Sequence, residues 1–206
     1  NSNEAKESMK TGIDGIGLYR SEYLFMNKKR MPSENEQFDS LRKTLRYLKG
    51  KPLTIRTLDV GNDKKVPSIE KYLTKSPNPA LGLRAIRLTL AYPKIFKRQI
   101  SAILRASVYG NVRIMLPMVS NVSELLETKK LIQDVKDELS LKKIKVSPKQ
   151  IPVGVLIETP AAALISESIA RNCDFLAIGT NDLTMYTLAI DRGDEEVAKI
   201  YDPAHL

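Results

Sequence analysis

The chain contains one cysteine and no long apolar run, and each absence excludes a class of protein. The single cysteine, Cys173, excludes an internal disulfide and any cysteine-rich metal site, so we interpret it as a small core residue. No run of eighteen apolar residues and no charged, apolar, small-residue leader is present, so the sequence predicts no membrane insertion, no secretion and a cytoplasmic location. Zinc-finger spacing, a P-loop, a complete G-x-G-x-x-G and a Ser-His-Asp elbow are also missing.

The chain does have enough apolar residues for a core, and it has an excess of positive charge. Its 206 residues are 42% hydrophobic, which predicts one folded domain. Lys and Arg exceed Asp and Glu by +9, which favours anionic partners in general. The basic residues cluster only at 28–30 and 142–145, without interleaved aromatic side chains. We therefore expect a solvated basic surface and no nucleic-acid partner.

Five apolar runs alternate with stretches of helical periodicity, and each run predicts a strand. We expect these strands at 15–19, 53–58, 112–116, 153–157 and 175–178. The last run is expected to be a buried strand that delivers polar groups at its end.

The helices between these runs are predicted from their capping and breaking residues. Ser33 and Glu36 form a capping box that opens one helix. A helical pattern resumes at Leu81 and breaks at Pro93, with Gly110 as its terminal cap. The later helices are expected to turn Leu164, Ile165 and Ile169 inward and to use Thr180 or Asp182 as a cap.

The alternation predicts an α/β fold with a parallel sheet and right-handed crossovers. Polar residues follow four different strands, whereas an open dinucleotide-binding sheet gathers its ligand groups at one switch point. This distribution favours a TIM-type (β/α)8 barrel, in which the functional residues lie at the C-terminal ends of the strands. Such a barrel has eight strands and only five are visible, so we expect residues 1–206 to form an incomplete barrel.

The charged residues at the strand ends form a candidate site. If these ends share one rim, Arg20, Arg56 and Arg192 lie around Glu158 and Asp182. Two carboxylates without histidine or cysteine favour a hard cation such as Mg²⁺, which completes its shell with water and substrate oxygens. Guanidinium groups bind phosphate and carboxylate oxygens in pairs. The pattern predicts a small, highly anionic phospho-compound bound with Mg²⁺, and a set of buried salt bridges without chemistry is the alternative.

Several longer motifs, taken in order, indicate a family. These are GIGLYRSEYLF, TIRTLDVG, NPALGLRAIR, AILRAS, RIMLPMV, IETPAAAL and IGTNDLTMYTLAIDRG. Through nearly its whole length the chain resembles the phosphoenolpyruvate-utilising enzymes, and among them it is most similar to the Enzyme I family of the bacterial sugar phosphotransferase system.

The resemblance implies Mg²⁺-dependent transfer of a phosphoryl group from phosphoenolpyruvate to a histidine, and from there to a small histidine-containing phosphocarrier protein. Pyruvate is the implied product, and a homodimer formed through this domain is the implied assembly. By the same resemblance, phosphoenolpyruvate is bound by Arg20, Arg56, Arg84, Asn181 and Arg192, and Mg²⁺ by Glu158 and Asp182.

The chain departs from the family pattern at two positions, Ser21 for threonine and Asn62 for glycine. The family's phosphorylated histidine belongs to an upstream domain, and its proton-donating cysteine lies on a barrel strand after residue 206. We therefore expect no catalytic residue within the chain, and neither Cys173 nor His205 lies in a matching motif.

Three other functions stay open at this point. One is another phosphoenolpyruvate enzyme of the superfamily, a dikinase or a synthase. A second is a Mg²⁺-dependent lyase or aldolase that acts on a pyruvate enolate. The third is a nonenzymatic module that uses its basic surface to bind an acidic partner or nucleic acid.

Overall fold

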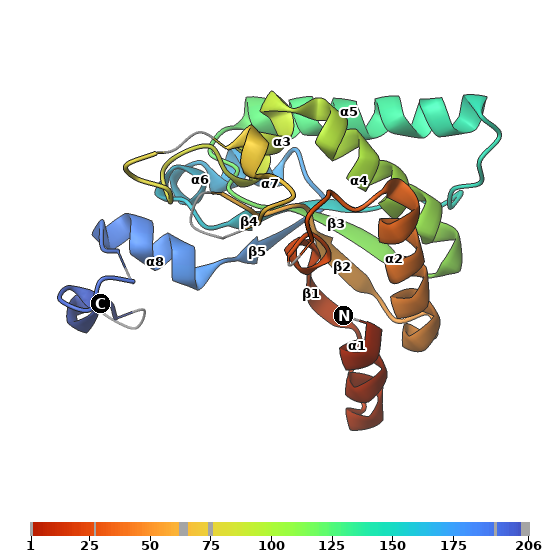
Figure 1. Cartoon of the computed structure of the whole chain (residues 1–206), viewed down its shortest axis with the longest axis horizontal. Coiled ribbons are helices and arrows are strands. Elements are labelled where there is room, and N and C mark those ends of the chain that lie inside the picture. The colour runs from red at the N-terminus through yellow and green to blue at the C-terminus, as the bar shows by residue number, and fades with distance from the viewer. Residues whose placement is uncertain (1, 27, 62–65, 74–75, 192, 203–206) are drawn as a thin grey trace.

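A computed structural model describes residues 2–26, 28–61, 66–73, 76–191 and 193–202 and shows one parallel sheet (Figure 1). Its strands lie side by side in the order in which they occur along the chain. They are β1 (Ile16–Arg20), β2 (Leu53–Arg56), β3 (Val112–Leu116), β4 (Val153–Ile157) and β5 (Phe175–Ile178). All five predicted strands are confirmed, with shifts of one or two residues at the ends of the first two.

Helices connect successive strands, except for α1, which precedes β1, and α8, which follows β5. They are α1 (Ser2–Ser8), α2 (Glu34–Leu48), α3 (Ala85–Ala91), α4 (Pro93–Ala106), α5 (Val122–Leu141), α6 (Pro160–Leu164), α7 (Ser166–Ala170) and α8 (Thr180–Leu188). The predicted capping box opens α2, because the Ser33 side chain accepts from the Glu36 N–H and the Glu36 carboxylate accepts from the Ser33 N–H.

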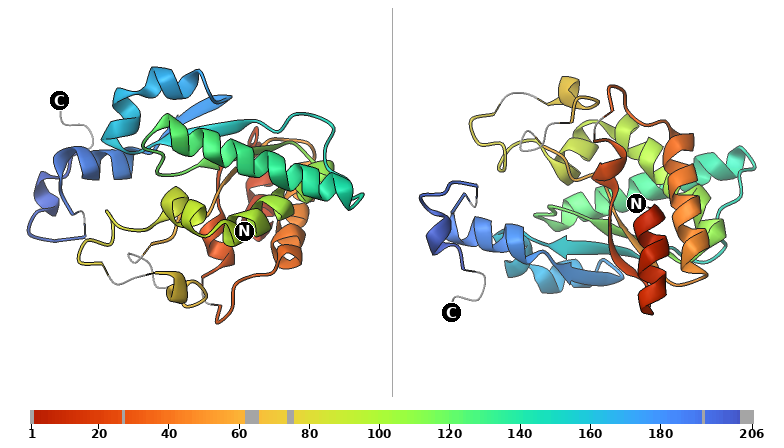
Figure 2. Two further views of the ribbon diagram at one scale, coloured as in Figure 1. Left: turned by 90° about the horizontal axis from the view of Figure 1, so that it is seen from above. Right: turned by 60° about the horizontal axis from the view of Figure 1, so that its bottom comes forward.

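The strand order and the helical crossovers make this sheet an incomplete TIM-type barrel. Doubly wound sheets reverse their strand order at a switch point, and no reversal occurs here. Helices α2, α4 and α5 lie together over one face of the sheet, and α8 extends from the end of β5 (Figures 1 and 2). The expected α/β half-barrel is confirmed.

The main core lies between the sheet and these helices. Alternate residues on the central strands face the helices because successive side chains of a strand point to opposite faces. Among these are Ile55, Ile114 and Val155, each fully buried against α2, α4 or α5 residues of the same cluster. The other face of the sheet carries Arg56 at its rim.

The sheet is less buried at its edge than the sequence suggests. We expected 175–178 to be a buried strand, but Ile178 is 70% exposed and Leu176 is also exposed. Strand β5 pairs only with β4 among the described residues, which accounts for this exposure. An incomplete barrel is expected to expose apolar side chains in this way.

Three helix predictions were wrong in detail. Helix α3 begins at Ala85 and not at Leu81, because Arg84 is extended and Ala85 has a positive φ of 49°. Gly110 is the C-cap of the 3-10 turn Ser107–Tyr109 that continues α4, as predicted, but its backbone is extended, and a side chain there would crowd Leu45.

The remaining two corrections concern the helices after β4 and β5. The predicted inward-facing Leu164 is 88% exposed, because the helix breaks at Ile165 into α6 and α7, whereas Ile169 is buried as expected. Helix α8 is preceded by Gly179 and has no side-chain cap from Thr180 or Asp182.

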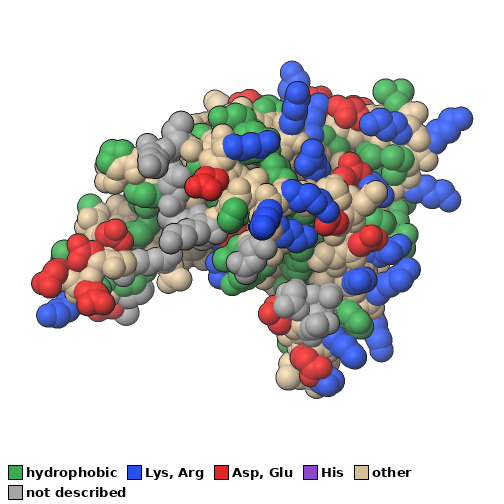
Figure 3. Space-filling view, viewed as in Figure 1, with side chains coloured by type: hydrophobic (Ala, Val, Ile, Leu, Met, Phe, Trp, Pro, Cys, Tyr) green, Lys and Arg blue, Asp and Glu red, His purple; other side chains and the backbone are tan. Residues whose placement is uncertain are grey.

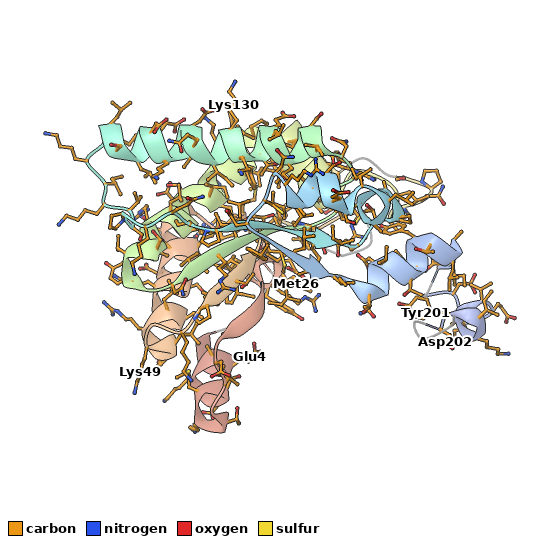
Figure 4. All side chains as sticks on the ribbon, turned by 180° about the vertical axis from the view of Figure 1, so that it is seen from behind. Glu4, Met26, Lys49, Lys130, Tyr201 and Asp202 are labelled. Atoms are coloured by element: carbon orange, nitrogen blue, oxygen red, sulfur yellow. The ribbon has the colours of Figure 1, made fainter. Side chains whose placement is uncertain are left out.

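The surface charge is unevenly spread. Lys and Arg side chains gather at the end of the molecule that carries α2, α4 and α5, and acidic side chains gather near the C-terminal residues (Figure 3). Lys49 and Lys130 point outward from this basic end (Figure 4). Within the described residues, no helix is both long and apolar enough to span a bilayer.

Candidate functional site at the C-terminal strand ends

A cavity of about 340 Å³ lies at the C-terminal ends of the strands, on the rim where the barrel prediction placed the chemistry. It is lined by arginines from the ends of β1 and β2, by carboxylates that follow β2 and β4, and by the first residues of α8. The charged and polar lining residues are Arg20, Arg56, Asp59, Arg84, Glu158, Asn181 and Asp182.

Arg20 and Arg56 are brought together by strand pairing. Each is the last residue of its strand, and the two are register partners in the parallel β1–β2 ladder. Residues paired in this way point to the same face of the sheet. Arg56 is nearly buried, whereas the Arg20 side chain is 42% exposed.

Two carboxylates hold these arginines. Glu22 Oε1 accepts from Arg20 Nε at 2.8 Å and from Arg56 Nη2 at 2.6 Å. Arg56 Nη2 also lies 3.2 Å from Asp59 Oδ2. The hydrogen bond from Arg20 to Glu22 raises the pKa of Arg20 above its ordinary value. Both guanidinium groups are therefore held at the rim by carboxylates of the chain.

Arg84 extends this network to α8. Its Nη2 lies 2.9 Å from Asp59 Oδ1 and 3.4 Å from Asp182 Oδ2, and its Nη1 donates to the Tyr186 hydroxyl at 3.3 Å. The Tyr186 hydroxyl in turn donates to Ala80 O at 2.5 Å. Charges of alternating sign thus run from the end of β1 to the first turn of α8.

The backbone around Arg84 is strained. Ala85 directly follows it with a φ of 49°, a conformation that costs a non-glycine residue roughly 1 to 3 kcal/mol. The Ala85 N–H donates to Val60 O, so the loop after β2 holds this conformation. Arg84 itself is extended, and its side chain lines the cavity.

Glu158 lies in a different environment from the arginines. Its Oε1 accepts from the Met118 N–H at 2.7 Å, and Met118 has a positive φ of 58°. Burial, followed by the negative charges of Asp59 and Asp182, raises the pKa of Glu158 from 4.5 to about 7. Gly179 lets the start of α8 lie close to Glu158, because a side chain at this position would come within 2.8 Å of Glu158.

These residues fit a divalent cation bound with an anion. No group of three or more His, Cys, Asp and Glu side chains suited to a metal occurs in the described parts of the chain. Mg²⁺ needs no such group, since it takes one or two carboxylates and fills the remaining positions with water and substrate oxygens. A cation would relieve the repulsion that raises the pKa of Glu158. The buried Nε of Arg56 has no hydrogen-bond acceptor among the described residues, as expected of a donor for an anion.

The cavity brings together most of the predicted site residues. Arg20, Arg56, Arg84, Asn181, Glu158 and Asp182 all line it. Arg192 and His205 lie outside the described residues, so their positions stay predictions. Cys173 precedes β5, at the opposite end of the strand from the cavity, and burial raises the pKa of its thiol.

Four residues that shape the site were not predicted as site residues. Glu22 and Asp59 hold the arginines, Met118 donates to Glu158 through its backbone, and Tyr186 contacts Arg84. The sequence carried a signal for the first two, because Arg56 within an apolar strand required an anionic partner. No side-chain signal marked Met118, because only its backbone is used.

Comparisons with known proteins point to one family. The sequence model described as "PEP-utilising enzyme, PEP-binding domain", where PEP is phosphoenolpyruvate, matches residues 1–206. The chain is 44% identical over 200 residues to the phosphoenolpyruvate-protein phosphotransferase of Priestia megaterium, covering 97% of this chain and 34% of that protein. It is 46% identical over 192 residues to the Staphylococcus epidermidis protein of the same name, covering 93% of this chain and 33% of that protein. It is 42% identical over 200 residues to the Bacillus subtilis protein of the same name, covering 97% of this chain and 35% of that protein. The chain thus spans about a third of the length of these relatives.

Proposed function

The chain belongs to the PEP-utilising enzymes through their PEP-binding domain, and from this membership and the cavity we propose that it binds phosphoenolpyruvate and Mg²⁺ for phosphoryl transfer. The proposed reaction moves the phosphoryl group to a histidine of an upstream domain, as the family resemblance implies, and then to a histidine-containing phosphocarrier protein. The observation that carries the proposal is the placement of three arginines and two carboxylates, Glu158 and Asp182, around one cavity at the strand ends.

The proposed substrate matches the charge of the cavity. Phosphoenolpyruvate carries a phosphate and a carboxylate, and guanidinium groups bind both kinds of oxygen in a planar fork. Arg20 and Arg56 are fixed on one side, Arg84 on another, and the Asn181 amide lines the same cavity. We assign Arg192 to the same substrate from the family motif alone.

In the proposed reaction the bond between phosphorus and the enol oxygen breaks and a bond between phosphorus and an imidazole nitrogen forms. The enolate that leaves takes a proton at carbon and becomes pyruvate. When bound by Glu158 and Asp182, Mg²⁺ would neutralise charge on the phosphoryl and enolate oxygens. The arginines contribute by holding the phosphoryl group in line with its acceptor, since orientation supplies a large part of such a rate.

Calorimetric titration of the full-length protein with phosphoenolpyruvate, with and without Mg²⁺, tests the proposal. We expect Mg²⁺-dependent binding that Glu158→Gln reduces about 100-fold. Glu124→Gln changes a carboxylate in the capping box of α5 and serves as the matched control, with binding unchanged. Binding that is independent of Mg²⁺ and of Glu158 contradicts the proposal.

Labelled phosphoenolpyruvate separates transfer from the lyase alternative. We expect label from the phosphoryl group to reach the protein in an acid-labile form together with release of pyruvate, as phosphohistidine requires. A lyase or aldolase that uses the same residues would form no such labelled protein. Loss of labelling in Arg56→Ala links the reaction to this cavity.

We also propose that the protein is a cytoplasmic homodimer that associates through this domain. Exposed apolar side chains outside the cavity support an interface, among them Leu164 on α6 and Leu188 on α8. Sedimentation of the full-length protein is expected to show a dimer whose dissociation depends on concentration. A strict monomer at high concentration contradicts this part of the proposal.

A further inference from the structure

Two positive side chains lie next to each other at the end of the β1–β2 ladder. Arg20 and Arg56 are register partners on neighbouring strands, and like charges placed in this way repel each other. Neither guanidinium can lose its charge at any ordinary pH. Something must hold the pair together before an anion arrives, because otherwise the exposed Arg20 side chain would turn into solvent.

Glu22 is placed to do this. The chain turns from β1 directly into a short 3-10 helix, Ser21–Leu24, which brings Glu22 back beside the strand end. A single oxygen, Oε1, accepts from Arg20 Nε and from Arg56 Nη2. The Glu22 side chain is fully buried, so these charge-assisted hydrogen bonds form away from solvent and are strong.

The turn that carries Glu22 is itself anchored. Gln99 on α4 is buried, and its amide Nε2 donates to Ser21 Oγ at 3.0 Å while its Oε1 accepts from the Leu58 N–H at 2.9 Å. One side chain thus joins the segment after β1 to the segment after β2. Phe25, also fully buried, anchors the far end of the same turn in a second apolar cluster with Leu58.

We propose that Glu22 is a positioning residue that holds Arg20 and Arg56 side by side as a preformed anion-binding pair, with Gln99 fixing the turn that carries it. The inference rests on the proposed function. Glu22 itself does not line the cavity, so it acts through the two arginines. Arginine has five N–H donors, and Glu22 engages one from each guanidinium, so both arginines keep further donors and both line the cavity.

The experiment compares Glu22→Gln with the wild-type full-length protein in three titrations, with MgCl₂ alone, with inorganic phosphate, and with phosphoenolpyruvate plus Mg²⁺. Glutamine keeps the shape and loses the charge. We expect phosphate and phosphoenolpyruvate to bind at least about tenfold more weakly, since a charge-assisted hydrogen bond contributes about that factor. Binding of Mg²⁺ alone is expected to stay within about twofold, because Glu22 bonds Arg20 and Arg56, whereas Glu158 is held by the Met118 N–H and Asp182 by Arg84.

The matched control is Glu36→Gln, which makes the same change in another arginine–carboxylate pair, Arg30 with Glu36, away from the cavity. All three ligands should bind to it as to the wild type. Unchanged anion binding by Glu22→Gln overturns the inference, and so does an equal loss of Mg²⁺ and anion binding, which would indicate a merely structural role. If the wild type binds phosphate but not phosphoenolpyruvate, the proposed function is refuted. The phosphate titrations of the wild type and Glu22→Gln then still test the positioning role of Glu22.

A second variant covers the case in which Glu22→Gln does not fold. Ser21→Ala removes the acceptor for Gln99 Nε2 and loosens the turn while leaving both arginines and Glu22 in place. Anion affinity is expected to fall about threefold, with Mg²⁺ affinity unchanged. Ser40→Ala, which removes a hydroxyl bonded to Tyr19, is its control. Equal anion affinity in the two variants counts against the inference.

Discussion

The two sides of the cavity differ in how their charges are balanced. On the arginine side, Arg20 and Arg56 share Glu22, and Arg56 and Arg84 share Asp59, so each cation lies beside a carboxylate of the chain. On the carboxylate side, Glu158 accepts a backbone N–H, and burial, followed by the charges of Asp59 and Asp182, raises its pKa. The charges on the arginine side are already paired, whereas an added cation would stabilise the carboxylate side.

This difference shows that the ion pairs can hold the arginines in place for a ligand without adding much to the net stability of the fold. Buried ion pairs often add little net stability, because desolvation of both charges offsets their attraction, but removing one partner costs several kcal/mol. The arginine side should therefore be sensitive to loss of a single charge. The carboxylate side should respond in the opposite way, because removal of one crowded negative charge relieves repulsion.

The largest expected effect comes from removing a cation from the arginine side. Arg56→Met leaves the buried carboxylates of Glu22 and Asp59 without one of their cations, and we expect a loss of about 3 to 5 kcal/mol in the free energy of unfolding. Phosphoenolpyruvate affinity should fall about 100-fold. Urea denaturation and calorimetry measure the two effects.

Arg56→Lys is the control for this substitution, because it retains the charge and loses the planar fork. We expect it to recover part of the stability and little of the affinity. If Arg56→Met changes the unfolding free energy by less than about 1 kcal/mol, the network is more hydrated than its burial implies.

The second prediction concerns the crowded side and its dependence on pH. The pKa of Glu158 is about 7 in the folded chain against an ordinary 4.5, so the folded state holds its proton more tightly. Stability from this group is present below pH 4.5 and is lost as pH rises to about 7, by about 3 kcal/mol in all. We expect Glu158→Gln to abolish this loss and to make the protein more stable than the wild type at pH 8 without Mg²⁺.

Thermal or urea unfolding at pH 5 and pH 8 measures this dependence, and Mg²⁺ should stabilise the wild type at pH 8 but not the variant. Glu36→Gln gives a control of opposite sign. Hydrogen bonds, first from Arg30 and then from Ser33, lower the pKa of Glu36 to about 2. Its contribution is present above pH 4.5 and is lost as pH falls toward 2, so its replacement should leave the behaviour between pH 5 and pH 8 unchanged.

The site could be predicted from sequence wherever a strand delivered the residue directly. Arg20 and Arg56 end their strands and Glu158 follows β4 immediately. The apolar runs and the expected barrel were therefore enough to predict that these residues lie around one cavity. Glu22 could not be assigned in this way, because its position depends on the 3-10 turn after β1. The role of Gln99 could not be predicted for a different reason, because Gln99 lies on a helix and its contacts depend on tertiary packing.

In the fold, too, features set by local sequence could be predicted and features set by tertiary contacts could not. Strand positions followed from apolar runs, and the capping box located the start of α2. The start of α3 could not be predicted because it depends on a positive φ at Ala85, which local propensity disfavours and the loop after β2 imposes. Exposure on β5 also depends on neighbouring strands, which a pattern within the strand does not report.

The smallest expected effect tests the link between the two sides. Tyr186 donates to Ala80 O and accepts from Arg84, which also contacts Asp59 and Asp182. Burial raises the pKa of Tyr186 above its ordinary value of 10, so its hydroxyl stays a donor at neutral pH. Tyr186→Phe removes only this hydroxyl, and we expect about 1 kcal/mol of lost stability and an approximately threefold weaker affinity for phosphoenolpyruvate.

The control for this last variant is Tyr19→Phe, which removes a hydroxyl bonded to Ser40 on the helix-facing side of the sheet. It should lose comparable stability with no change in affinity, because it does not contact the cavity arginines. Urea denaturation and calorimetry on both variants separate the two contributions. Equal affinities in Tyr186→Phe and Tyr19→Phe would show that Asp59 and Asp182 alone fix Arg84, and that the two sides of the cavity are joined through charge and not through the tyrosine.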